Sequence, residues 1–258
     1  MVVWLGWADR NYDRWMIDVR WLQAVLDLPA EQFDVAAQFW AAATNTTRGE
    51  VHRDHDEFVH LLPPSGAMHL ELQRIEGGAS AHLDLLVDNI DAATKEAKRL
   101  GATLLSRPGH SVLTTPGGVP FCIVPYSGEA ERAPLIDAEL PHAVDQICLD
   151  IPHEHFEVDI DFWAALTGWE PNPARLPEFR SFAQPKELPL RVLLQQLGTD
   201  DEGVARAHID VSSGDHVTVL TDRHESAGAT VLERLEYWTA LNGPAGMPYC
   251  LTSREPTT

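Results

Sequence analysis

The chain has 258 residues, 44% of them hydrophobic, which is enough for one large domain or for two ordinary domains with proper cores. It carries 39 acidic and 19 basic side chains, and the net charge of −20 disfavours nucleic acid and anionic membranes as partners. Three cysteines without a CxxC pattern do not make a disulfide framework, and no apolar run is long enough to cross a bilayer, so we expect a cytoplasmic protein.

The first half of the chain predicts two rounds of one pattern, in which a strand and a helix are followed by three more strands. In the first round, Phe33, Ala36 and Trp40 recur at helical spacing after Pro29. In the second round, Gly101 marks the end of the helix. The expected elements are strand 21–28, helix 31–43, strands 46–51, 58–62 and 68–75, then strand 80–87, helix 91–100, and strands 102–106, 110–114 and 119–125.

The second half of the chain repeats the first. The longest match has no gap and includes a Phe-Trp pair in each copy, which falls on the buried face of the expected helix. The matching stretches are "LDLPAEQFDVAAQFWAAAT" (26–44) with "LDIPHEHFEVDIDFWAALT" (149–167), "AHLD" (81–84) with "AHID" (207–210), and "GVPFC" (118–122) with "GMPYC" (246–250). Two copies of one fold follow from these matches.

The repeat predicts an α+β protein built from four βαβββ units, paired into two tandem modules. One such unit cannot cover both faces of its sheet, so we expect the curved, mixed sheets of paired units to enclose cups. The expected division is an N-terminal extension at 1–19, a first module at 20–126, a charged and proline-bearing linker at 127–143, and a second module at 144–258.

The strands "AHLD" and "AHID" place polar side chains where a core face would be apolar. Residues two apart in a strand share a face, so His82 lies beside Asp84 and His208 lies beside Asp210. The face that carries these side chains is therefore expected to line a cavity.

These stretches resemble the vicinal oxygen chelate superfamily, which has the glyoxalase, bleomycin-resistance and extradiol-dioxygenase fold. The resemblance is carried by "LDLPAEQFDVAAQFW", "LDIPHEHFEVDIDFWAALTGWEP", "AHLDLLVDNIDAATKEAKRLGAT" and "TTPGGVPFCIV", and it covers about residues 20–253. It points to glyoxalase-like bacterial proteins of unassigned activity. The superfamily includes isomerases, epimerases, dioxygenases, thiol transferases and metal-free drug binders, so the fold alone does not name a reaction.

The resemblance implies metal ligands on the first, fourth, fifth and last strands of a module. In the first module these positions hold Gln23, Glu71 and His82, which leave open coordination positions as catalytic metal sites do. The implied ion is zinc, nickel, manganese or iron, and the competing expectation is that no ion binds. Glu71 and Asp84 are the candidates for moving a proton, and Asp84 could instead orient His82.

The second module has a degenerate version of this site. It offers Gln146, Gln195 and His208, but Leu193 replaces the acidic residue of the fourth strand. The ligands could also come from crossed halves, in which case Gln23 would meet His208 instead of His82.

The last strand departs from the family pattern in both modules. The family typically has glutamate there, whereas this chain has Cys122 and Cys250. Their apolar neighbours predict buried, reduced thiols. Ordinary glyoxalase I activity is therefore not expected, because it needs a carboxylate base close to the metal.

Two functions remain open at this point. One is a metal-dependent isomerase, lyase or dioxygenase that acts on a small, oxygen-rich molecule in the first cup. The alternative is a metal-free protein that sequesters a drug or metabolite, as bleomycin-resistance proteins do. Either protein would have a small-molecule ligand and would be a monomer or a homodimer.

Overall fold

The computed structural model describes residues 16–51, 55–107, 109–126, 128, 131–135, 139–173, 175–201 and 203–257. Most of the extension expected at 1–19, and part of the linker expected at 127–143, lie outside these residues. Within the described chain, no helix is both long enough and apolar enough to span a membrane.

Both halves of the chain show the expected βαβββ order, twice each. The first module contains β1 (Val19–Pro29), α1 (Phe33–Ala43), β2 (Thr47–Val51), β3 (Phe58–Leu62), β4 (Leu70–Ile75), β5 (Ser80–Val87), α2 (Ile90–Arg99), β6 (Thr103–Ser106), β7 (Ser111–Thr114) and β8 (Pro120–Pro125). The second contains β9 (Ala143–Ile151), α3 (Phe156–Thr167), β10 (Pro171–Pro173), β11 (Phe179–Phe182), β12 (Arg191–Gln196), β13 (Arg206–Ser212), α4 (Val217–Ser226), β14 (Thr230–Arg234), β15 (Trp238–Asn242) and β16 (Pro248–Thr252). Short 3-10 turns precede α1, α3, α4 and β16.

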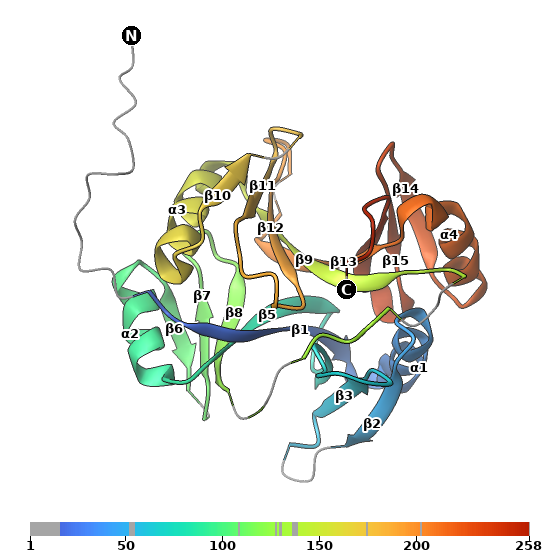
Figure 1. Ribbon diagram of the computed structural model, residues 1–258, viewed down its shortest axis with the longest axis horizontal. Coiled ribbons are helices and arrows are strands. Elements are labelled where there is room, and N and C mark those ends of the chain that lie inside the picture. The colour runs from blue at the N-terminus through green and yellow to red at the C-terminus, as the bar shows by residue number, and fades with distance from the viewer. Residues whose placement is uncertain are drawn as a thin grey trace.

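Each module forms one mixed sheet of eight strands, and the two sheets have the same topology. The strand order is β2-β3-β4-β1-β5-β8-β7-β6 in the first sheet and β10-β11-β12-β9-β13-β16-β15-β14 in the second. The central pair is antiparallel in each sheet, and each central strand has a parallel neighbour on its other side. Figure 1 shows the middle strands of both sheets near the centre of the molecule, with the outer strands curving away from it. The predicted α+β fold with two tandem modules is confirmed.

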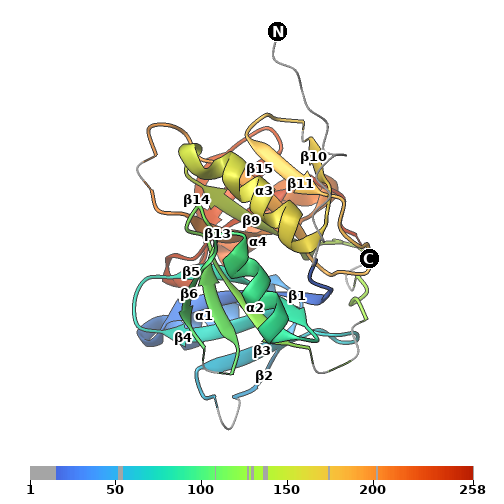
Figure 2. The ribbon, with the colours of Figure 1, turned by 90° about the vertical axis from the view of Figure 1, so that its left-hand side faces the viewer.

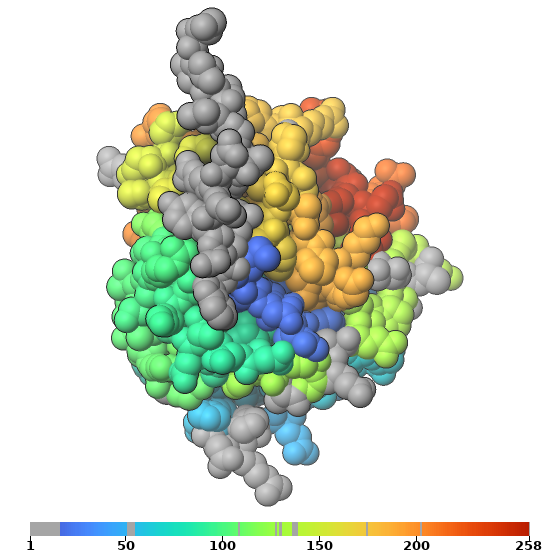
Figure 3. Space-filling view, turned by 60° about the vertical axis from the view of Figure 1, so that its left-hand side comes forward, coloured from blue at the N-terminus to red at the C-terminus, as the bar shows by residue number. Residues whose placement is uncertain are grey.

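The central strands have one apolar face and one polar face. On β1, Leu22, Ala24 and Leu26 are fully buried in a core that continues into the second module, where Leu149 and Ile209 join it. Because side chains alternate along a strand, the residues between them face the other way, into the cup of their own sheet. Figure 3 shows the two modules in continuous surface contact on one side of the molecule.

The first helix of each module packs against the last strand of the other module. Trp40 of α1 lies 5.0 Å from Tyr249 of β16, and Trp163 of α3 lies 5.3 Å from Phe121 of β8, both measured between ring centroids in edge-to-face geometry. Figures 1 and 2 show the result, with α1 beside α4 at one end and α2 beside α3 at the other. The Phe-Trp pairs were expected on the buried faces of their helices, and they also join the two modules.

A buried carboxylate adds a polar contact to this interface. Asp159 of α3 accepts hydrogen bonds from Thr115 Oγ1 at 2.6 Å and from the Gly117 amide at 2.7 Å, and both donors belong to the turn before β8. A Cβ atom at Gly117 would lie 2.7 Å from the Asp159 carboxylate, so the close approach requires glycine. Burial raises the pKa of Asp159, which shows that the charge is held at a cost in free energy.

His224 of α4 gives the interface a pH dependence. Its Nδ1 lies 2.9 Å from the Tyr249 hydroxyl, and burial lowers its pKa to about 4, with His142 and Arg223 adding positive charge nearby. In the unfolded chain the His224 imidazole is protonated as the pH falls below about 6.5. In the folded protein the same imidazole stays neutral until the pH falls to about 4. The stabilisation is therefore complete above about pH 6.5 and declines by about 3 kcal/mol as the pH falls to about 4.

We expect His224→Gln to flatten the pH dependence of the unfolding free energy between these two pH values. The measurement is urea unfolding of wild type and variant across the range. His153→Gln is the matched control, because His153 is exposed and should leave the curve unchanged. Parallel curves for wild type and His224→Gln would show that the interface does not hold this histidine neutral.

Candidate functional site

Strand register places six residues with a polar side chain or a thiol on the cup face of the first sheet. Gln23 of β1 is paired with Asp84 of β5, and Asp27 of β1 is paired with Ser80. His82 lies between these pairs on β5, and Cys122 of β8 is paired with Asp84. Paired residues share a face, so the predicted placement of Gln23 and His82 on one inner face is confirmed. We call this group of residues, together with Glu71 of β4, the first cup.

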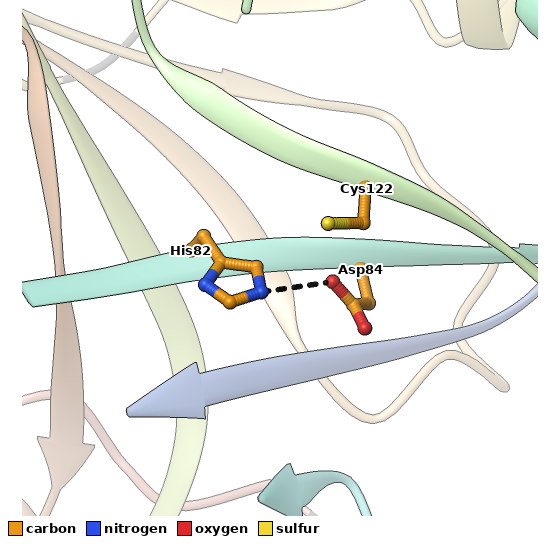
Figure 4. A group of neighbouring side chains, drawn as sticks. All are labelled: His82, Asp84 and Cys122. Atoms are coloured by element: carbon orange, nitrogen blue, oxygen red, sulfur yellow. Dashed lines mark ion pairs between the residues drawn. The ribbon is translucent and has the colours of Figure 1, made fainter. Parts of the chain in front are cut away.

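His82 is held by two carboxylates. Its Nδ1 donates to Asp27 Oδ2 at 2.9 Å, and its Nε2 lies 3.4 Å from Asp84 Oδ1. Ser80 Oγ donates to the same oxygen of Asp27 at 3.1 Å and so helps to fix this carboxylate. Figure 4 shows the imidazole and the Asp84 carboxylate side by side along β5, with the Cys122 sulfur pointing toward them from β8. The ligand atoms of His82, Asp84 and Cys122 lie within 4.8 Å of one another.

The second sheet repeats this arrangement. His208 Nδ1 donates to Asp150 Oδ2 at 3.0 Å, and His208 Nε2 lies 3.4 Å from Asp210 Oδ1 and 3.7 Å from the Cys250 sulfur. Gln146 Nε2 donates to Asp210 Oδ2. This group is the second cup. One of its differences from the first cup is Cys148 in place of Val25, so the ligand atoms of Cys148, Asp150 and His208 also lie within 4.8 Å of one another.

The carboxylates govern the charge of both histidines. Burial alone would lower the pKa of His82, but its hydrogen bond to Asp27 and the adjacent Asp84 carboxylate raise that pKa well above the ordinary value. Burial likewise lowers the pKa of His208, but Asp150, Cys148 and Asp210 raise that pKa well above the ordinary value. Asp27 Oδ1 is buried without a hydrogen bond among the described residues, and so are Asp84 Oδ1 and Asp210 Oδ1, each of which has a histidine Nε2 at 3.4 Å. A buried oxygen of this kind can accept a further donor or bind a cation.

A cavity of about 420 Å³ lies over the second cup. His208, Asp210 and Cys250 line it, together with residues from the outer strands and from the chain near the C-terminus. Its volume is in the range typical of sites for small organic molecules, roughly 300–1,000 Å³. The constellation around His208 therefore opens onto a space that a ligand can enter.

The structure places the expected ligands of the first cup in different surroundings. Gln23 donates to the Met68 sulfur at 3.5 Å, and His82 lies between its two carboxylates. Glu71 forms an ion pair of 2.8 Å with His60, which is paired with it on β3. Glu71 belongs to none of the three groups of described side chains whose ligand atoms lie within 4.8 Å of one another.

The expected ligands of the second cup lie closer together. Gln146 contacts Asp210, which in turn contacts His208. Gln195 accepts a hydrogen bond from the Cys148 thiol at 3.6 Å. Among the described residues, the polar partners of His82 all lie in the first sheet, and those of His208 all lie in the second sheet.

Sequence reasoning missed Asp27 and Asp150, which orient the two histidines. The signal was present, since both copies have an aspartate in "LDLP" and "LDIP", four residues after the glutamine and on the same face of the strand. It also treated the cysteines of the last strand as inert. Cys122 is buried as predicted, whereas Cys250 is partly exposed, so the prediction of burial was wrong for Cys250.

Comparison with known proteins identifies the fold of both modules. A family model described as "Glyoxalase-like domain" matches residues 23–124 and again residues 146–252. The chain belongs to this glyoxalase-like family of the vicinal oxygen chelate superfamily. No curated protein matches its sequence.

Solved structures similar to the two glyoxalase-like modules include extradiol dioxygenases. A catechol 2,3-dioxygenase is 15% identical with a TM-score of 0.60, covering 94% of this chain and 91% of the enzyme. Homoprotocatechuate 2,3-dioxygenase from Arthrobacter globiformis is 14% identical with a TM-score of 0.62, covering 92% and 80%. A halotolerant catechol dioxygenase is 13% identical with a TM-score of 0.59, covering 92% and 87%. At these identities the likeness concerns the fold alone.

The cysteines of the glyoxalase-like modules should differ in reactivity. Cys250 lines the cavity and is partly exposed, whereas Cys122 and Cys148 are 5% and 1% exposed. Burial raises the pKa of all three thiols, so each should react more slowly than a free thiol. We expect iodoacetamide to alkylate Cys250 first and Cys148 last, as measured by peptide mass spectrometry. The urea-unfolded chain is the control, and earlier labelling of Cys122 or Cys148 in the folded protein would refute the order.

Proposed function

We propose that this protein binds a small organic molecule in the second cup, beside a divalent metal ion held by His208, Asp210 and Cys250. The observation that carries the proposal is the repeated constellation of aspartate, histidine, aspartate and cysteine, which in the second module opens onto the cavity. The proposed reaction class is that of a metal-assisted lyase, isomerase or dioxygenase.

The donor set suits a borderline-soft ion such as zinc. Imidazole, carboxylate and thiolate are all common zinc ligands, and three protein ligands leave room for a molecule from the cavity. Asp150 supports this assignment because it binds Nδ1 of His208 and leaves Nε2 directed at Asp210 and Cys250. Carboxylates fix metal-binding histidines in this way in many proteins. Asp210 would bind the ion through its buried Oδ1, which makes no hydrogen bond among the described residues, while Gln146 holds Oδ2.

A bound ion would act as a Lewis acid toward oxygen atoms of the small molecule. The residues of the chain then have separate tasks. Asp150 orients the imidazole, and Gln146 holds the Asp210 carboxylate through Oδ2. Thr252 and Leu193 contribute to the wall of the cavity, which limits the size of the molecule.

The first cup has the same kind of donor set in His82, Asp84 and Cys122, and we propose it as a second ion site. It is an alternative to the set of Gln23, Glu71 and His82 that the family resemblance implies. Glu71 and Asp84 remain the proposed carboxylates for moving a proton in this cup. Asp84 has support from its position, since its buried Oδ1 lies 3.4 Å from His82 Nε2.

A metal-free sequestering protein is the second candidate. One observation favours it, namely that each histidine already lies between two carboxylates and is stabilised there as a cation. Such a cluster satisfies the imidazole without any ion. In that case the second cup would bind its ligand by shape and charge alone.

Metal analysis of the purified protein separates the two candidates. After equilibration with zinc and removal of the excess, we expect about two zinc ions per chain, with His208→Ala and His82→Ala each losing about one. The measurement is elemental analysis by plasma mass spectrometry. A chain that takes up no zinc under these conditions supports the sequestering protein instead.

Two further variants control this experiment. His153→Ala removes an exposed imidazole and should retain both ions. Glu71→Leu distinguishes the two ligand sets of the first cup, because it should leave the zinc content unchanged if His82, Asp84 and Cys122 bind the ion. Loss of one ion from Glu71→Leu would favour the set implied by the family.

A further inference from the structure

The cavity over the second cup has a positive end in an otherwise acidic protein. The chain has 39 acidic and 19 basic side chains, yet three arginines line this one cavity, namely Arg175, Arg191 and Arg254. The acidic residue that lines it, Asp210, is already engaged by Gln146 and His208. The local charge thus favours an anion, although the protein as a whole repels one.

Arg191 is the partly buried arginine of the three that has no ion pair among the described residues. It lies on β12, paired with Gln146 of β9, and its side chain is half-buried. Within the described chain its guanidinium makes no hydrogen bond and no ion pair. Burial and the neighbouring Arg254 lower the pKa of Arg191, and the charges of Asp145 and Asp210 offset this only in part, so an anionic partner would relieve what remains.

The other two arginines are already occupied. Arg254 binds the Asp145 carboxylate through both terminal nitrogens, and Nη1 is 2.9 Å from Oδ2. Arg175 is exposed and lies over the ring of Tyr237, 4.5 Å from its centroid. One free guanidinium matches a single negative charge, and its planar fork suits the two oxygens of a carboxylate.

Aromatic side chains form another part of the cavity wall. Phe179 of β11 and Trp238 of β15 both line it, and their rings meet edge to face with centroids 5.8 Å apart. Both are partly exposed, so they offer apolar surface to a ligand. This wall can therefore contact a flat apolar group of a ligand.

The first module lacks the corresponding cation. Its residue at the position of Arg191 is His69, whose Nε2 donates to the Val144 carbonyl at 2.8 Å. Burial lowers the pKa of His69, which keeps it neutral. The same strand carries Glu71 where the second module has Leu193. Compared with the first cup, the second cup therefore has one more positive charge, from Arg191, and one fewer negative charge, because Leu193 replaces Glu71.

From these observations we infer that the second cup binds aromatic carboxylates, with Arg191 pairing the carboxylate and Phe179 and Trp238 contacting the ring. The inference deepens the proposed function by naming the ligand class of the same cavity. It does not depend on the metal ion.

Calorimetric titration of the full chain with 2-naphthoate, 2-naphthamide and 2-naphthyl phosphate tests the inference. Naphthoate should bind about ten- to a hundredfold more tightly than the neutral amide. Arg191→Gln should lose this advantage while it binds the amide as wild type does, which also shows that the cavity has kept its shape. Arg234→Gln, at an exposed arginine of β14, is the matched control and should bind naphthoate normally.

The titrations are run once with chelator and once with zinc, so that the two proposals can fail separately. Binding that depends on Arg191 with chelator present supports the ligand class even if no metal binds. Equal affinity for acid and amide, no binding of naphthoate, or unchanged binding to Arg191→Gln overturns the inference. Tighter binding of the phosphate ester assigns the cavity to phosphate esters and overturns the choice of carboxylate.

Discussion

The aromatic pair on the first helix of each module packs against the last strand of the other module. Phe39 and Trp40 reach Tyr249, and Phe162 and Trp163 reach Phe121. Each contact adds about 0.5–1.5 kcal/mol to the burial of the rings themselves. Because a helix from each module completes the core of the other, neither sheet covers its apolar face alone. This packing of helices against the opposite module therefore determines which face of each sheet remains for polar side chains.

The polar faces carry charges that would be costly in a core. In each cup a histidine is held between two aspartates of two neighbouring strands. The attraction within these pairs offsets the free-energy cost of removing the charged groups from water. The duplication is informative, since Asp27 and Asp150 occupy equivalent positions and make equivalent bonds. The cups diverge farther out, where Glu71 and His69 correspond to Leu193 and Arg191. The shared centre suggests common ion chemistry, and the divergent walls suggest different ligands.

The internal repeat predicted the fold well, because two copies of one strand-helix pattern, which align without a gap over 26–44 and 149–167, admit few architectures. The shared face of Gln23 and His82 also followed from strand periodicity alone. The sequence did not predict which partner each carboxylate contacts. Glu71 was expected at the ion, but strand pairing puts it opposite His60, a neighbour that only the register of β3 and β4 reveals. Arg191 was not singled out, because its significance depends on the absence of a partner in three dimensions.

X-ray absorption at the zinc edge of the zinc-loaded protein tests the central claim most directly. If histidine, aspartate and cysteine hold the ion in each cup, the spectrum should require one sulfur ligand at about 2.3 Å beside nitrogen and oxygen ligands at about 2.0–2.2 Å. Nitrogen and oxygen ligands alone, as glutamine, glutamate and histidine would provide, would contradict the account.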